Sequence, residues 1–184
     1  MLLEPLTSSL ILIDEQEKLM PVIYNQEQVI KNSITLIKAA DHLSVPIVLT
    51  EQYSSGLGLT VSEISDAAQG AAQIIDKTSF SAMKDGTFKD YISELANLGR
   101  TSFVIAGCEA HICVLQTAID LKDAGFDVFF VTDAVGSRTE NSMQVARERL
   151  TAHGVKLVTT EMVLFEWIER YDSKAFKELR ELVV

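Results

Sequence analysis

Three side chains suited to nucleophilic catalysis follow separate apolar segments of this 184-residue sequence: Asp14, Lys77 and Cys113. Cys113 comes after an apolar, β-branched segment, residues 102–106, and a turn that begins at Gly107. The residues that follow have the spacing of a helix packed on a sheet. A cysteine in the first turn of a helix lies near unpaired backbone N–H groups and the positive end of the helix dipole, which lower the pKa of a thiol. The sequence therefore predicts a reactive thiolate at Cys113.

Asp14 and Lys77 supply the groups that a cysteine nucleophile needs. A carboxylate can accept the thiol proton as a general base, and a nearby ammonium group stabilises the thiolate. The backbone N–H groups of Glu109 and Cys113 can hold the oxyanion that forms when a carbonyl carbon is attacked. The predicted chemistry is acyl transfer.

Each of these residues also has a purely structural interpretation. A free cysteine is usually a small, inert core residue, an aspartate at a strand end commonly forms a turn, and a loop lysine is usually solvated. His111 offers another partner for the thiol, but a helical residue two positions before Cys113 points away from it. The joint occurrence of Asp14, Lys77 and Cys113 at three strand ends favours the catalytic interpretation.

The elements that must position these residues alternate between short apolar strands and helices. Strands are expected over residues 9–13, 46–50, 73–75, 102–106, 127–132 and 155–158, and helices over 25–43, 85–98, 137–153, 161–171 and 173–182, with a further helix from near Cys113 to about Ala124. Residues 54–59 are expected to form a loop. This order predicts one domain, residues 1–184, with a three-layer α/β/α sandwich around a mainly parallel, six-stranded, doubly wound sheet.

Ligands of such a sheet bind beyond the carboxyl ends of the strands, where the strand order reverses. Asp14, Lys77 and Cys113 therefore converge if the first and fourth strands are neighbours. Polar and aromatic side chains of the adjoining loops are expected to line a substrate pocket: Gln16, Gln52, Tyr53 and Phe80. Cys108 is expected to be a packed turn residue, or one that resolves an oxidised Cys113.

Two further patterns concern the helix ends. Asn25 with Gln28, and Ser137 with Glu140, have the spacing of capping boxes. The remaining histidines, His42 and His153, are expected to cap helices or face solvent.

The composition argues against several classes of partner. The formal net charge of −10 disfavours nucleic acid and anionic membranes, which bind basic surfaces. The sequence has no membrane-length apolar stretch and no basic n-region at its start. It also lacks G-x-G-x-x-G and G-x-x-x-x-G-K motifs, which disfavours a nucleotide-binding sheet. Two cysteines five positions apart are expected to stay reduced, which predicts a cytoplasmic protein.

Four segments resemble the isochorismatase-like cysteine hydrolase family: residues 10–19, 50–53, 76–82 and 107–118. The resemblance covers nearly the whole chain, with the motifs in the family's order. It implies a parallel six-stranded sheet and a catalytic triad formed by Asp14, Lys77 and Cys113. It also implies a cis peptide between Cys108 and Glu109, which would direct the Glu109 N–H into the oxyanion hole.

The sequence departs from the family's nicotinamidase-type members, which carry an aspartate and histidines after the second strand as metal ligands. The matching segment here is Gln52-Tyr53-Ser54, and amides and hydroxyls are poor ligands for transition metals. No metal and no other cofactor are therefore expected. The most similar branch, on Thr50-Glu-Gln-Tyr53, Lys77-Thr-Ser-Phe-Ser81 and Ser137-Arg-Thr139, is a small group of functionally uncharacterised hydrolases.

True isochorismatases do not depend on this cysteine, so Cys113 indicates acyl transfer instead. Together the residues and the resemblance predict a metal-independent hydrolase that cleaves a small amide, carbamate or ester through a Cys113 acyl-enzyme. The alternative is a catalytically silent scaffold that binds a small ligand or a protein partner. Because family members assemble into dimers, tetramers or larger rings, a homo-oligomer is expected, with residues 167–184 around Trp167 as an interface.

Overall fold

Six strands form the centre of the molecule in a computed structural model of the protein, which describes residues 1–182. They are β1 (Ser8–Ile13), β2 (Ile47–Gln52), β3 (Ala72–Lys77), β4 (Ser102–Cys108), β5 (Asp127–Gly136) and β6 (Lys156–Val158). They make one sheet in the order β3-β2-β1-β4-β5-β6, and every pair is parallel. The predicted fold class is confirmed, and the first and fourth strands are neighbours, which is the condition for Asp14, Lys77 and Cys113 to converge.

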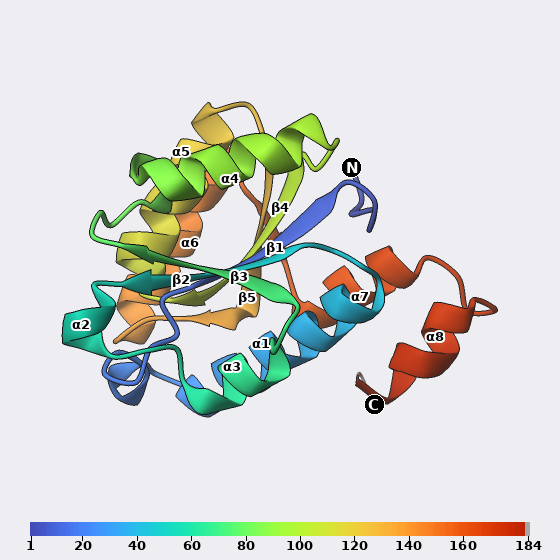
Figure 1. The fold of residues 1–184 in the computed structure, drawn as a ribbon, viewed down its shortest axis with the longest axis horizontal. Coiled ribbons are helices and arrows are strands. Elements are labelled where there is room, and N and C mark those ends of the chain that lie inside the picture. Colours follow the sequence, from blue (N-terminus) through green and yellow to red (C-terminus); the bar gives the residue numbers. More distant parts are fainter. Residues whose placement is uncertain (183–184) are drawn as a thin grey trace.

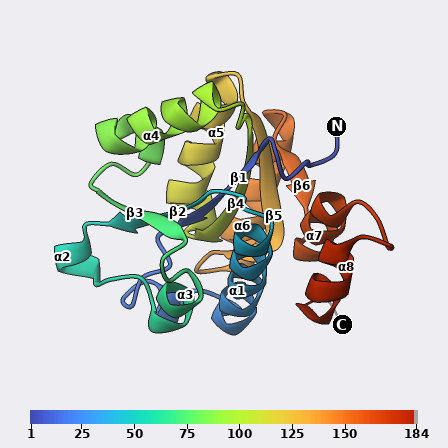
Figure 2. The same cartoon turned by 45° about the vertical axis from the view of Figure 1, so that its right-hand side comes forward.

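Helices cover both faces of this sheet (Figure 1 and Figure 2). They are α1 (Gln26–His42), α2 (Ser54–Leu57), α3 (Ser62–Ala67), α4 (Gly86–Asn97), α5 (Leu115–Asp123), α6 (Glu140–Ala152), α7 (Thr160–Ile168) and α8 (Lys174–Leu179), with the 3₁₀ turns η1 (Met20–Val22), η2 (Ala82–Lys84) and η4 (Arg180–Leu182) and the π-helix η3 (Ala110–Val114). The helices α1, α3, α7 and α8 lie on one side of the sheet, and α4, α5 and α6 lie on the other. Among the described residues, no helix has the length and apolarity needed to cross a bilayer.

Burial on both faces explains why residues 10–13 of β1 are all apolar. Leu10 and Leu12 belong to the core cluster beneath α1, whereas Ile11 and Ile13 belong to the cluster beneath α5. Successive side chains of a strand point to opposite faces, so a doubly covered strand needs apolar residues at every position. Asp14 is the first charged residue after this strand, and it marks the edge at which the site forms.

Both predicted capping boxes are wrong. Asn25 has a left-handed backbone (φ 57°), and its side chain caps no N–H group of α1. Thr139, not Ser137, caps α6 by accepting a hydrogen bond from the Ser142 N–H (3.1 Å). The hydroxyl of Ser137 instead bonds to His111.

Two short helices also depart from the sequence prediction. The expected loop at 54–59 contains α2, and α3 follows it. Helices of four and six residues make too few turns to show the apolar repeat that reveals a helix in a sequence. The last two residues of the predicted domain and interface, 183 and 184, lie outside the described part of the chain.

Gly107 allows β4 to approach β1 closely, and its replacement by alanine is expected to destabilise the fold. Its φ is +119°, and a Cβ at this position would collide with the backbone of Ile13. We predict that Gly107→Ala lowers the free energy of unfolding by about 3 kcal/mol or more, from steric overlap plus backbone strain. Urea denaturation provides the measurement.

Gly125→Ala is the matched control. Gly125 also has a positive φ (+93°), but no heavy atom lies within 4 Å of the position that an alanine Cβ would take. Backbone strain alone predicts a loss of about 1 kcal/mol. Equal losses for the two variants would show that the contact with Ile13 does not matter.

Candidate active site

Asp14 and Lys77 form a buried ion pair at the carboxyl ends of β1 and β3. Lys77 Nζ lies 2.8 Å from Asp14 Oδ2, and neither side chain has any exposed area. Removing two charges from water costs several kcal/mol per ion, and an apolar pair of similar volume would often stabilise a fold equally well. The pair therefore points to a chemical role, in agreement with the predicted convergence of these residues.

Hydrogen bonds from β2 and from the loop after β3 complete this pair. The Thr50 hydroxyl donates to Asp14 Oδ1 (2.7 Å), which fixes the plane of the carboxylate. Lys77 Nζ also donates to Gln52 Oε1 (2.8 Å) and to the carbonyl of Ser79 (3.3 Å). Thr50 was not predicted as a site residue, although it begins one of the sequence motifs. Its position beside Asp14 follows from the β1–β2 register, which only the structure provides.

Cys113 lies in η3, and its Sγ is 4.0 Å from Gln52 Oε1. The same oxygen accepts the hydrogen bond from Lys77, so Gln52 links the cysteine to the ion pair. Cys113 is only 4% exposed. The structure thus brings all three residues of the predicted triad to one place, beneath the surface of the molecule.

The expectation of a low thiol pKa at Cys113 is wrong. Burial raises the pKa of the Cys113 thiol well above its ordinary value, and the charge of Asp14 raises it further, whereas Lys77 lowers it. The sequence argument relied on helix N–H groups alone and omitted desolvation, which disfavours the thiolate. The resting cysteine is a neutral thiol that needs a base at the moment of attack.

The expected cis peptide between Cys108 and Glu109 is absent, since every peptide bond in residues 1–182 is trans. The turn instead uses left-handed backbone at Glu109 (φ 61°), following Gly107 (φ 119°). Cys108 is fully buried and its thiol donates to the Asp14 carbonyl (2.7 Å). Cys108 is therefore a packed turn residue, as one of the two interpretations expected.

A polar network ties the cysteine turn to the segment before α6. Arg138 Nε and Nη2 each lie 2.7 Å from Oε1 of the buried Glu109 carboxylate. His111 Nδ1 lies 2.6 Å from Ser137 Oγ. His111 is thus engaged by Ser137, which leaves the alternative of a Cys–His dyad without structural support. No spacing in the sequence indicates this network, because its two halves lie in separate segments of the chain.

The other histidines contact surface carboxylates away from the triad. His42 pairs with Glu178 and His153 pairs with Asp123, each at 2.7 Å. Within residues 1–182, no group of three or more His, Cys, Asp or Glu side chains is arranged to hold a metal ion.

The predicted pocket residues differ in their positions. Gln16 is fully buried and does not face a pocket: its Nε2 donates to the carbonyls of Gln52 (3.1 Å) and Gly58 (2.6 Å), and its Oε1 accepts from the Gln52 N–H (2.7 Å). Gln16 therefore fixes the end of β2, which carries Gln52. Tyr53 and Phe80 are both more than half exposed.

A second buried acid, Glu15, lies next to the triad but points toward α1. Ser33 Oγ donates to Glu15 Oε1 (2.6 Å), and the other carboxyl oxygen has no partner within the described residues. Burial raises the pKa of Glu15 from 4.5 to about 8, because its effect exceeds that of the Ser33 hydrogen bond, which lowers the pKa. Glu15 is consequently protonated in the folded protein near neutral pH.

Glu15→Gln is predicted to make the protein relatively more stable as the pH rises. Between pH 4.5 and about 8 the folded state keeps a proton that the unfolded state has lost, so this group costs stability with increasing pH. Glutamine cannot ionise and keeps the Ser33 bond. The free energy of unfolding of the variant should match that of the wild type near pH 4. Near pH 8 it should be higher than that of the wild type, by up to roughly 5 kcal/mol.

Unfolding free energies measured from pH 4 to 9 test this. Glu27→Gln, at an exposed position of α1, is the control and should show no such growing difference. A difference for Glu15→Gln that is independent of pH would contradict the assigned protonation.

Asp14 and Lys77 are predicted to act on the Cys113 thiol with opposite signs. Asp14→Asn removes the charge that raises the thiol pKa, and Lys77→Met removes the charge that lowers it. At pH 8 the rate of iodoacetamide labelling of Cys113 should rise about tenfold in Asp14→Asn, as for a pKa change of about one unit, and should fall in Lys77→Met.

Peptide mapping separates Cys113 from the fully buried Cys108, which serves as an internal control and should remain unlabelled. Equal changes of labelling rate in both variants would show that access, not charge, controls the thiol.

Comparison with known proteins places this chain and its α/β fold in a defined class. Residues 8–162 match the isochorismatase domain, and the chain belongs to this hydrolase family. Isochorismatase domain-containing protein 2 of Danio rerio is 40% identical over 177 residues, covering 96% of this chain and 86% of the relative.

Solved structures agree with this assignment. The MAR1 ribonuclease of Caenorhabditis elegans has a TM-score of 0.92 and 34% identity, and the match covers 100% of this chain and 92% of that one. The YcaC gene product of Escherichia coli, described as an octameric hydrolase of unknown specificity, has a TM-score of 0.88 and 24% identity over 100% of this chain and 91% of its own. The latter likeness concerns the fold alone.

Proposed function

We propose that this protein is a metal-independent cysteine hydrolase that cleaves a small amide, carbamate or ester through an acyl-enzyme on Cys113. The observation that carries this proposal is the fully buried Asp14–Lys77 pair, whose ammonium group shares Gln52 Oε1 with the Cys113 thiol. A base, a cation and a nucleophile are thereby held within one water-poor site. Membership of a hydrolase family supports the same reaction class.

In the proposed reaction, Asp14 takes the proton of the Cys113 thiol as the sulfur attacks the substrate carbonyl carbon. Lys77 stabilises the thiolate while it forms. The tetrahedral intermediate then expels its amine or alcohol, which leaves with the proton held by Asp14. Water, activated by the same carboxylate, attacks the thioester, and the released thiolate recovers the proton. Because the thiol is neutral at rest, the reaction depends on a base within reach.

We further propose the backbone N–H groups of Glu109 and Cys113 as donors to the oxyanion. The Arg138–Glu109 ion pair supports this role, because it holds the left-handed residue that starts the cysteine turn. Gln52, Tyr53 and Phe80 are the proposed substrate contacts, and Gln16 acts through Gln52.

The burial of Cys113 and the raised pKa of its thiol favour the alternative, a silent scaffold that binds a ligand or a protein partner. The two accounts differ in whether a covalent intermediate forms. A buried thiol that never reacts would leave the Asp14–Lys77 pair without a chemical role.

The proposed partner is a small molecule. The net charge of −10 argues against a nucleic acid substrate,, although one structural relative is named a ribonuclease. We also propose a cytoplasmic homo-oligomer. Exposed Met162, Phe165 and Tyr171, on and next to α7, support self-association through the C-terminal helices. Trp167 itself belongs to the core, where its Nε1 donates to Ser8 Oγ (3.0 Å).

An acyl-trapping experiment tests the catalytic proposal. Incubation with p-nitrophenyl acetate should give a burst of nitrophenol and an acetyl group on Cys113, detected by peptide mass spectrometry. Cys113→Ala should abolish both, because the attacking sulfur is gone. Asp14→Asn should slow the later hydrolysis of the acetyl-enzyme by about a hundredfold or more, because the water that attacks the thioester loses its general base.

Cys108→Ser is the matched control, since it alters the neighbouring cysteine of the same turn. It should retain the burst and the adduct. An adduct on other residues of the Cys113→Ala protein, with turnover unchanged, would refute the proposal and leave the scaffold as the better account.

A further inference from the structure

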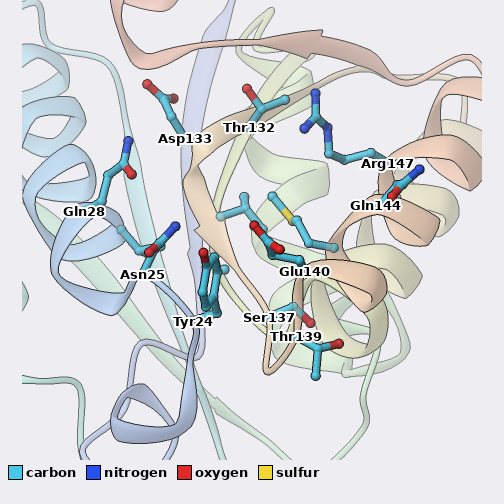
Figure 3. A pocket seen from close by; sticks show the side chains of 14 residues that line it. Tyr24, Asn25, Gln28, Thr132, Asp133, Ser137, Thr139, Glu140, Gln144 and Arg147 are labelled. Atoms are coloured by element: carbon cyan, nitrogen blue, oxygen red, sulfur yellow. The ribbon is translucent and has the colours of Figure 1, made fainter.

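A cavity of about 440 Å³ lies between the first turns of α1 and α6, apart from the triad (Figure 3). None of Asp14, Lys77 and Cys113 lines it. The cavity exists because β5 continues after β6 has ended. The last residues that β5 and β6 pair are Val131 and Val158, so residues 132–136 of β5 have no neighbouring strand on the β6 side. The two helices pack on opposite faces of the sheet, so their first turns leave this strand edge open.

The floor of the cavity is apolar, and its walls carry unused hydrogen-bonding groups. Val29, Val135 and Met143 provide the apolar surface. Within residues 1–182, no hydrogen bond engages the side-chain ends of Tyr24 or Gln28, which project from the α1 side (Figure 3). A concave site of this size, with an apolar base and a few polar groups, is typical of pockets for small molecules.

The charges around the cavity are separated. Arg147, from α6, forms no ion pair with any described residue, and Figure 3 places it across the cavity from Asp133. Asp133 uses only Oδ1, which accepts bonds from the N–H (2.8 Å) and the hydroxyl (3.0 Å) of Thr160. Glu140, at the start of α6, adds a second carboxylate. Arg147 therefore suits a carboxylate, whereas Asp133, across the cavity from it, and Glu140 suit an ammonium group,.

We propose that this cavity binds a free α-amino acid with an apolar side chain, at a site separate from the triad. Arg147 pairs with the ligand carboxylate, Asp133 and Glu140 accept hydrogen bonds from the ammonium group, and the side chain rests on Val29 and Val135. A purely anionic ligand would face the two carboxylates, and a purely cationic one would face Arg147. The zwitterion satisfies both ends at once.

Isothermal titration calorimetry with L-leucine, L-methionine and L-phenylalanine tests this site by measuring their dissociation constants for the full-length protein. At least one should bind, whereas its amide, which lacks the carboxylate, and its N-acetyl derivative, which lacks the ammonium, should bind at least about tenfold more weakly. Arg147→Gln should weaken binding by a similar factor. Arg149→Gln changes an arginine on the same helix but outside the cavity, and it should leave the affinity for the amino acid unchanged.

Cys113→Ala should bind the amino acid like the wild type, which separates this site from the proposed catalytic one. The proposal is overturned if none of the three amino acids binds, if both analogues bind as tightly as the parent, or if Arg147→Gln and Arg149→Gln behave alike. Failure of the acyl-trapping experiment has no bearing on these outcomes.

Discussion

The buried ion pair between Lys77 and Asp14 is the constraint on which the site depends. A lysine and an aspartate sixty-three residues apart can neutralise each other only if β1, β2 and β3 end at the same edge in the correct register. Either charge alone in that position would be strongly destabilising. The requirement for pairing therefore favours one strand order over its alternatives and, with Thr50 and Gln52, delivers the groups that surround Cys113.

Much of the fold was predictable because the strands and the helices each have a characteristic pattern of apolar residues in the sequence. Residues 10–13 of β1 and 103–106 of β4 are apolar at every position, as strands covered on both faces must be, and α1 and α4 show a helical repeat between polar ends. The order of these elements predicts a parallel sheet, and the strand ends then bring Asp14, Lys77 and Cys113 together once the first and fourth strands are neighbours. The sequence thus predicts the order of strands and helices, and the edge of the sheet at which the three site residues lie follows from that order.

Properties that depend on register and burial were not predictable. Thr50 bonds to Asp14 because of how β2 aligns with β1, and Arg138 reaches Glu109 across a turn with no recognisable pattern. The protonation of Cys113 was predicted with the wrong sign, because helix position can be inferred from a sequence but depth below the surface cannot. Gln16 was assigned to a pocket for the same reason, since a loop position was taken to mean exposure.

The π-helix at Ala110–Val114 gives the cysteine turn a property that ordinary helices lack. A turn of this kind holds one residue more than an α-helical turn, so the side chains of η3 are offset from the directions that an unbroken extension of α5 would give them. Removing a single residue from this stretch would restore α-helical geometry and rotate the preceding side chains by roughly 100° relative to α5. The orientation of the Cys113 sulfur toward Gln52 thus depends on the number of residues in η3 and not only on which side chains it contains.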